Sequence, residues 1–186
     1  MSRDSIVLFL SLLALFAQVT VIVVVAVFVV PIARPVRTLV IAQLGPTATS
    51  FAWLVAGVSM AGSLYLSEGA HFMPCKLCWY QRIAMYSLAL ILAVAALRRR
   101  RDVAVYAAPL AGVGVVISTY HMMVERFPRL ESNVCDLSVP CTVIWTKRFG
   151  IETIPTMAFS GFLLILVTLF VGRRFERTSA VPLEEE

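Results

Sequence analysis

Residues 74–82, PCKLCWYQR, lead into the apolar run 79–97 and place two cysteines where a candidate membrane helix begins. In the first turn of a helix, Cα atoms three residues apart lie roughly 5 Å from each other, which is within the range that a disulfide requires. Cys75 and Cys78 can therefore close and reopen a disulfide with little backbone movement. The segment predicts a redox-active cysteine pair at a membrane surface.

The composition is that of an integral membrane protein. Of the 186 residues, 60% are hydrophobic and only 15% are charged, whereas soluble domains carry about 25% charged residues. A helix needs about 20 apolar residues to cross a bilayer, and the candidate spans are 5–32, 50–67, 79–97, 103–124 and 153–172. We therefore expect an all-α integral membrane protein, built as a four-helix transmembrane bundle with an additional N-terminal transmembrane helix.

The chain divides into three expected regions. They are an N-terminal helix with a cytoplasmic linker (1–49), a helical bundle with an extracytoplasmic loop at 125–150 (50–172), and a cytoplasmic tail (173–186). The first apolar stretch is longer than the roughly 7–15 residues of a signal-peptide core, and it lacks a small-x-small cleavage site. We expect this helix to be retained.

The net charge of +5 does not indicate nucleic acid as a partner, because most of the basic residues stand at helix ends rather than on one face. The positive-inside rule places such clusters in the cytoplasm; they are Arg34 with Arg37, Arg98–Arg101, and Arg173, Arg174 and Arg177. Counting spans from them puts both cysteine pairs on the extracytoplasmic side of a bacterial cytoplasmic membrane, where disulfides form readily.

The residues around the first cysteine pair favour thiolate chemistry. Cys78 would lie near the N-terminus of the third span, where free N–H groups stabilise an anion. Arg82, four residues further on, shares its helical face and can reach the sulfur or an oxygen of a bound ligand. His121 is expected at a similar depth on the fourth span, where it can bind a polar ligand, transfer protons or simply pack between helices.

The second pair, Cys135 and Cys141, lies in a polar loop that can meet another protein. A thiolate of an incoming protein can attack a disulfide there, and the resulting thiols can reduce the first pair by further exchange. The electrons then need a two-electron acceptor at the membrane edge. A lipid-soluble quinone beside Cys78 and Arg82 is the candidate, inferred from location alone.

Two alternatives without catalysis stay open. Both cysteine pairs can be structural disulfides. A structural disulfide, however, stabilises a protein more when it closes a longer loop than the one within Cys-x-x-Cys. Four thiolates can also bind zinc, although lipid-facing helices, rather than a compact zinc ribbon, flank these pairs; our expectation is no metal. Haem attachment is not supported, because Trp79 instead of histidine follows Cys78.

The sequence resembles the DsbB/BdbC-type disulfide bond formation proteins over roughly residues 54–172. The matching segments are 62–68 (GSLYLSE), 75–82 (CKLCWYQR), His121, 139–141 (VPC) and 149–155 (FGIETIP). The five-residue gap within the second pair is similar to the BdbC-like branch. The resemblance implies a four-helix membrane bundle and a thiol oxidase that passes electrons to menaquinone or ubiquinone.

The resemblance also implies roles for individual residues. Cys75, Cys78, Cys135 and Cys141 would be the catalytic cysteines, with Cys78 contacting quinone and Cys75 exchanging with the second pair. Arg82 and His121, together with Cys78, would form the quinone site. The implied partner is a DsbA-like thioredoxin-fold dithiol oxidase, which this protein would reoxidise to support disulfide formation in exported proteins.

The apolar segment 5–32 departs from the resemblance, because the four-helix pattern does not require it. Two other enzyme classes compete with this interpretation. A vitamin-K-epoxide-reductase-like enzyme would share the bundle and the quinone, but its helix-end cysteine pair generally follows the loop pair, and here it comes first. A transmembrane electron exporter would need cysteines within its spans.

Overall fold

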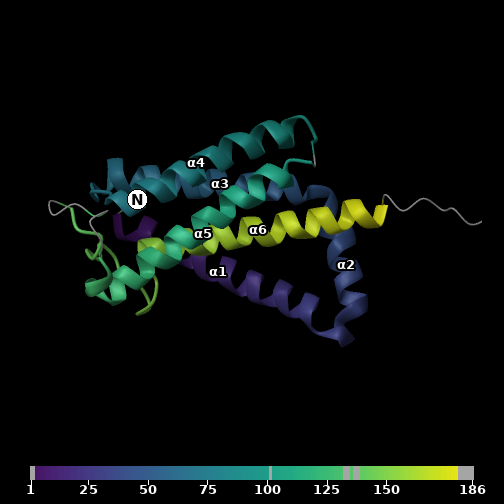
Figure 1. Ribbon diagram of the computed structural model, residues 1–186, viewed down its shortest axis with the longest axis horizontal. Coiled ribbons are helices and arrows are strands. Elements are labelled where there is room, and N and C mark those ends of the chain that lie inside the picture. The colour runs from purple at the N-terminus through teal and green to yellow at the C-terminus, as the bar shows by residue number, and fades with distance from the viewer. Residues whose placement is uncertain (1–2, 101, 132–134, 136–138, 180–186) are drawn as a thin grey trace, which may run out of the picture.

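The computed structural model describes residues 3–100, 102–131, 135 and 139–179, and over these residues the chain is helical with no strand. Figure 1 shows the arrangement of the helices. The α-helices are α1 (Arg3–Val29), α2 (Arg34–Leu44), α3 (Ala48–Leu64), α4 (Lys76–Leu97), α5 (Ala104–Arg126) and α6 (Ile154–Ser179). The short elements are 3₁₀ turns at Pro31–Ala33, Gly45–Thr47 and Pro128–Leu130 and a π-helix at Tyr65–Gly69 that extends α3.

Among the described residues, five helical segments are long and apolar enough to span a bilayer. They are α1, α4, α5, α6 and the stretch from Pro31 to Gly69, which contains α3. The predicted all-α membrane bundle with an additional N-terminal helix is thereby confirmed. The boundaries differ in detail from the predicted spans. The helix predicted at 153–172 continues to residue 179, and the linker before the second span contains the helix α2.

Helix α6 lies at the centre of the bundle, in contact with α1, α2, α3 and α5. Small residues allow the helices to approach closely, as is common between membrane helices. Ala52 and Ala56 of α3 and Ala107 and Ala111 of α5 are completely buried. Gly114 of α5 lies directly against the ring of the buried Phe162, and a Cβ at this glycine would collide with that ring.

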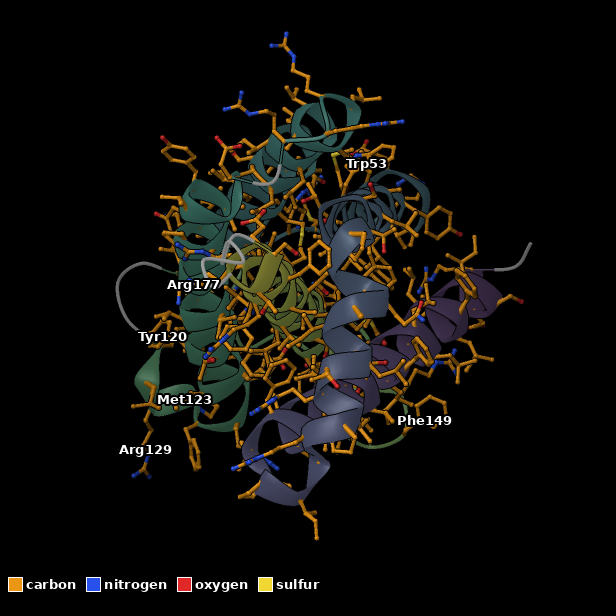
Figure 2. All side chains as sticks on the ribbon, turned by 90° about the vertical axis from the view of Figure 1, so that its right-hand side faces the viewer. Trp53, Tyr120, Met123, Arg129, Phe149 and Arg177 are labelled. Carbon is orange, nitrogen blue, oxygen red and sulfur yellow. A yellow bond between two sulfur atoms is a disulfide. The ribbon has the colours of Figure 1, made fainter. Side chains whose placement is uncertain are left out.

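Helix α2 lies across one end of the bundle and connects α1 to α3 (Figures 1 and 2). It contacts α6, and at its C-terminal end the buried Gly45 packs against Phe175 of α6 so closely that a Cβ would collide with the ring. We call this the arginine end of the bundle. It carries the basic residues Arg34, Arg37, Arg98, Arg99, Arg100, Arg173, Arg174 and Arg177.

The opposite end, which we call the cysteine end, brings together the start of α1, the segment 70–75 and the loop between α5 and α6 (Figure 1). Arg148 donates a hydrogen bond to Asp4 at 2.8 Å and forms an ion pair with it. The guanidinium of Arg3 lies 4.9 Å from the centroid of the Phe72 ring. The N-terminus and both cysteine pairs therefore share one end of the molecule, as counting the spans predicts.

Candidate active site

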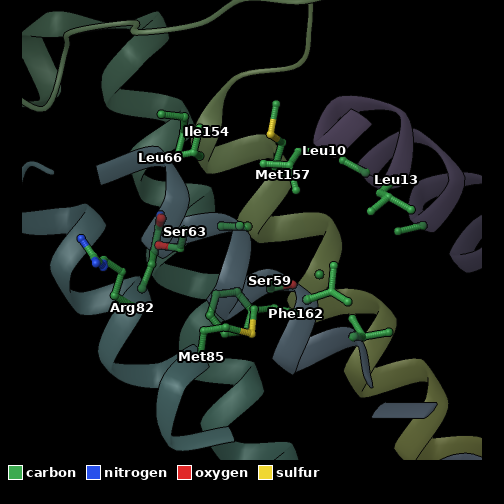
Figure 3. A pocket seen from close by; sticks show the side chains of 18 of the residues that line it. Leu10, Leu13, Ser59, Ser63, Leu66, Arg82, Met85, Ile154, Met157 and Phe162 are labelled. Atoms are coloured by element: carbon green, nitrogen blue, oxygen red, sulfur yellow. The ribbon is translucent and has the colours of Figure 1, made fainter. Parts of the chain in front are cut away.

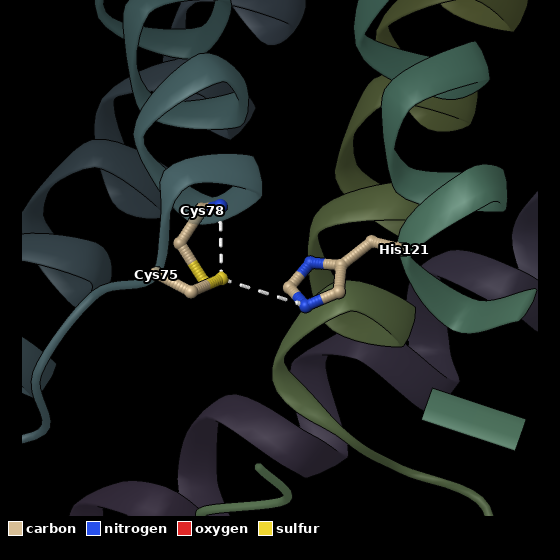
Figure 4. Close-up of side chains that lie close together, drawn as sticks. All are labelled: Cys75, Cys78 and His121. Atoms are coloured by element: carbon tan, nitrogen blue, oxygen red, sulfur yellow. Dashed lines mark hydrogen bonds between the residues drawn. The ribbon is translucent and has the colours of Figure 1, made fainter. Parts of the chain in front are cut away.

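The first cysteine pair begins α4. Cys75 is the N-cap residue, and its sulfur accepts a hydrogen bond from the backbone N–H of Cys78 at 3.4 Å. Both thiols are free, and their sulfur atoms lie 3.0 Å apart (Figure 4). The hydrogen bond shared with the Cys78 thiol, aided by His121, outweighs burial and holds the pKa of Cys75 well below its ordinary value.

His121 of α5 lies between the two cysteine pairs. Its Nε2 is 3.7 Å from the sulfur of Cys75 (Figure 4) and 3.2 Å from the carbonyl oxygen of Cys141. Its Nδ1 is 3.3 Å from the side-chain amide nitrogen of Gln81. Because a carbonyl oxygen only accepts, Nε2 carries the hydrogen and Nδ1 accepts from Gln81.

The second pair forms a disulfide between Cys135 and Cys141 with Cα atoms 5.8 Å apart. Cys141 is almost fully buried, at 1% exposure, whereas Cys135 is half-buried. The backbone N–H of Cys141 donates to Glu131 at 2.8 Å, and its carbonyl accepts from His121. Cys141 shares one apolar cluster with Cys75, Leu77 and Val124, so the two cysteine pairs meet inside the protein.

Arg82 lies almost two turns inside α4 and is only 9% exposed. Its guanidinium donates hydrogen bonds to Tyr86 at 3.0 Å and to Ser67 at 3.2 Å, and it stacks 4.7 Å from the centroid of the Trp79 ring. Neither ion pair found among the described residues involves Arg82. This buried side chain is therefore held by neutral groups.

A cavity of about 450 Å³ begins at Cys78 and Arg82 and extends between α1, α3, α4 and α6 (Figure 3). Its polar side chains come mainly from α3 and α4, whereas α1 and α6 supply apolar ones. Ser67, which belongs to the π-helix and binds Arg82, also lines it. Cysteine, arginine and hydroxyl groups thus occupy one end of an otherwise apolar space.

The structure brings Cys78 and Arg82 together at the cavity. It places the other four predicted site residues differently. Cys75 and His121 do not belong to the cavity lining; they lie against Cys141, so contact between His121 and a quinone stays a prediction. Cys135 and Cys141 lie in the loop at the cysteine end.

Sequence reasoning missed three partners of this site. Gln81, one residue before Arg82, orients His121, and Ser67 binds Arg82. Gln18 of α1 donates to Glu152 at 2.8 Å and to Ser160 at 2.9 Å. A glutamine within an otherwise apolar span is a signal that could have pointed to such a role, because polar groups in a membrane need partners.

The first cysteine pair and His121 together also have the composition of a metal site. Ligand atoms of Cys75, Cys78 and His121 all lie within 4.8 Å of one another, and thiolate with imidazole is a donor set that Zn²⁺ prefers. Cys135 and Cys141 cannot complete a four-thiolate site while they are joined to each other.

Fold and site together define the class: a multi-pass helical membrane protein with two cysteine pairs that meet at one end of the bundle. The profile of the family "Disulfide bond formation protein DsbB" matches residues 45–172. The chain therefore belongs to the DsbB family, which confirms the resemblance. It is a membrane protein of disulfide bond formation with thiol:disulfide oxidoreductase activity.

Curated proteins similar to this chain include disulfide formation proteins of the C type. The chain is 40% identical to the probable disulfide formation protein C 2 of Bacillus anthracis, over 67% of this chain and 89% of that protein. It is 42% identical to the disulfide bond formation protein C of Bacillus subtilis, over 62% of this chain and 84% of that protein. No solved structure matches it.

Proposed function

We propose that this protein is a membrane thiol oxidase that reoxidises a DsbA-like thioredoxin-fold partner and passes the electrons to a membrane quinone, menaquinone or ubiquinone. One observation carries the proposal. Within a single pair, Cys78 lines the apolar cavity together with Arg82, whereas Cys75 lies buried beside His121 and Cys141. The pair thus connects the loop disulfide with a space suited to a lipid-soluble acceptor.

Cys135 is the proposed point of entry. It is the more exposed sulfur of the loop disulfide, since Cys141 is only 1% exposed. A thiolate of the partner attacks Cys135 and releases Cys141 as the leaving thiolate. The second thiolate of the partner then displaces Cys135. The partner leaves as a disulfide, and both loop cysteines are reduced.

Cys141 is the proposed donor to the first pair. It lies in the same buried cluster as Cys75, and when the pair is oxidised its sulfur attacks Cys75 and releases Cys78. Cys135 then resolves the mixed disulfide and restores the loop bridge. The cysteines described here stand at this stage, with the loop pair oxidised and the first pair reduced.

The cavity fits a quinone. Its lining combines a long apolar space with a buried cation, and Arg82 can donate a hydrogen bond to a ring oxygen. A bound quinone supplies an acceptor for two electrons and two protons. Cys75 and Cys78 lose two electrons and two protons when their disulfide re-forms, so one partner dithiol is oxidised for each quinone reduced.

The proposed location is a bacterial cytoplasmic membrane with both cysteine pairs on the extracytoplasmic side. The eight arginines that cluster at the arginine end, opposite the cysteines, support this orientation. Disulfide exchange with exported proteins requires an oxidising compartment. DsbB-family membership and the curated names of the relatives support the same assignment.

A metal-binding module is the second candidate, favoured by the convergence of Cys75, Cys78 and His121. A vitamin-K-epoxide-reductase-like enzyme would also use a quinone, but the family match argues against it. Zinc binding can be tested directly. If the reduced protein binds stoichiometric Zn²⁺ and does not oxidise dithiols, the metal module is correct and the oxidase is not.

The experiment that tests the oxidase is partner oxidation by single-cysteine variants in membranes. Cys75→Ser and Cys78→Ser should each abolish quinone-dependent oxidation of a DsbA-like partner at normal protein levels. A partner that keeps only its attacking cysteine cannot be released, so it should accumulate as a mixed disulfide with Cys135 of the wild-type protein. None should form with Cys135→Ser or Cys141→Ser, because both variants lack the loop disulfide. Undiminished partner oxidation by Cys75→Ser would contradict the proposal.

A further inference from the structure

Helix α1 stands outside the matched family profile, which begins at residue 45, yet it forms a wall of the cavity. Six of its side chains line that space, and all are apolar: Phe9, Leu10, Leu13, Ala14, Phe16 and Ala17. In Figure 3, Leu10 and Leu13 project from α1 toward the side where Ser63 and Arg82 lie. The cavity of this protein is therefore shaped by an element that a four-helix bundle lacks.

Polar contacts fix α1 against the start of α6. Gln18 donates to Glu152 at 2.8 Å and to Ser160 at 2.9 Å. Glu152 is completely buried, and its second carboxylate oxygen has no hydrogen-bond partner among the described residues. Burial raises the pKa of Glu152, with the Gln18 hydrogen bond opposing it. An amide bound to a buried carboxyl in a membrane holds a helix at a defined position, because hydrocarbon offers neither group another partner.

The α1–α3 side of the cavity is open to the surroundings. Near the cysteine end, α1 and α3 approach closely, because a Cβ at Gly62 would lie 2.9 Å from Leu10. On both sides of this contact, apolar side chains of the two helices line the cavity and are nevertheless 41–67% exposed: Phe9, Phe16, Phe51 and Leu54. This edge faces the bilayer, and we call it the α1–α3 slot.

From this geometry we propose that the α1–α3 slot holds the isoprenoid tail of the quinone, with α1 as the wall that selects for it. The inference rests on the proposed function, because that function supplies a ligand with a polar ring and a long apolar chain. A ring beside Cys78 and Arg82 must let its tail leave the cavity. The α1–α3 slot is an apolar route from that end into the lipid.

Leu13→Trp tests the slot, because it adds an indole to the wall of the cavity. Leu12→Trp is the matched control: Leu12 is 50% exposed on the same helix and does not line the cavity. The probes are a short-chain menaquinone and dimethylnaphthoquinone, which carries the same ring without a tail. Full-length protein in nanodiscs is incubated with each, and the quinone retained above that of empty nanodiscs is measured by mass spectrometry.

We expect Leu13→Trp to weaken menaquinone binding by about 10- to 100-fold, the cost of overfilling a packed space. Binding of dimethylnaphthoquinone should not change, and Leu12→Trp should bind both compounds as the wild type does, with all three proteins melting at the same temperature. The proposal would be overturned if Leu13→Trp weakened the binding of both compounds equally or of neither. It would also be overturned if the variant displaced a co-purified phospholipid instead of menaquinone. If the wild type binds neither quinone, the slot and the quinone step of the proposed function both fail.

Discussion

The position of His121 between the cysteine pairs makes it a positioning residue for Cys75. Its Nε2 contacts both the sulfur of Cys75 and the carbonyl of Cys141, and Gln81 holds the other ring nitrogen. A hydrogen-bond donor beside a sulfur stabilises its thiolate. In the proposed exchange Cys75 leaves as a thiolate when Cys135 resolves the mixed disulfide, and a thiol of lower pKa leaves faster. We therefore propose that His121 assists this step, even though it does not line the cavity.

His121→Ala should raise the pKa of Cys75, because the variant removes a hydrogen bond that lowers it. The measurement is the rate of Cys75 alkylation by iodoacetamide against pH, resolved by mass spectrometry. In the wild type the midpoint should fall below neutral pH, and in the variant it should move upward. His71→Ala, which alters an exposed histidine of the preceding segment, is the control and should match the wild type. A wild-type midpoint at the ordinary thiol value of about 8.5 would contradict this role.

Arg82→Ala should raise the apparent KM for quinone by about 10- to 100-fold, the usual cost of losing hydrogen bonds from a charged group. Exchange between the partner and the Cys135–Cys141 disulfide should continue at the wild-type rate. Tyr86→Phe is a useful comparison, because it removes one hydrogen bond to Arg82 but keeps the ring. Its effect on KM should be smaller. Equal loss of exchange and quinone use in Arg82→Ala would indicate a structural role for the arginine.

At the scale of elements, the helices and the first cysteine pair could be predicted because both depend on short-range sequence. Hydropathy over some 20 residues finds a span, and a spacing of three places Cys75 and Cys78 on one face. The partners of α1 could not be predicted in this way. Gln18 and Glu152 are 134 residues apart in sequence, and their contact depends on how α1 packs against α6. Gly150 adopts a left-handed backbone conformation, φ 77°, and turns the chain just before Glu152. The resulting position of the Glu152 side chain likewise could not be predicted from the sequence.

Gln18→Leu should destabilise the protein by about 1–2 kcal/mol, because it removes both hydrogen bonds and leaves the buried Glu152 without its partner. In detergent we expect the melting temperature to fall by about 2–6 °C. Thr20→Val is the matched control on the same helix, since the hydroxyl of Thr20 donates to the backbone oxygen of Phe16 within α1. An unchanged melting temperature for Gln18→Leu would mean that α1 does not depend on this contact.

At the scale of the whole molecule, polarity separates the two ends. The arginine clusters of the interhelical connections and the end of α6 lie at the arginine end, and all four cysteines lie at the cysteine end, so a single orientation in the membrane satisfies both the charge rule and the redox requirement. The match to the DsbB family covers the bundle from residue 45 onward, and α1 adds a wall to the cavity of that bundle. Family membership therefore accounts for the cysteines, whereas one wall of the cavity comes from outside the matched region.

Reporter fusions test this orientation. Green fluorescent protein inserted in the loop between α4 and α5, after Arg100, should fluoresce, because it folds in the cytoplasm. Alkaline phosphatase inserted after Phe127, between α5 and α6, should be active only outside. A membrane-impermeant maleimide should label the reduced loop cysteines in intact cells. The reverse pattern in the two fusions would contradict the proposed sidedness.

The most direct test of the account is an anaerobic reaction of the purified protein with a reduced DsbA-like partner and a soluble quinone, following quinone absorbance and thiol content together. We predict that one quinone is reduced for every two partner thiols lost, and that reduction stops in Cys78→Ser. If the quinone stays oxidised while the thiols of the wild-type protein remain inert or retain stoichiometric zinc, the protein is not a quinone-linked thiol oxidase.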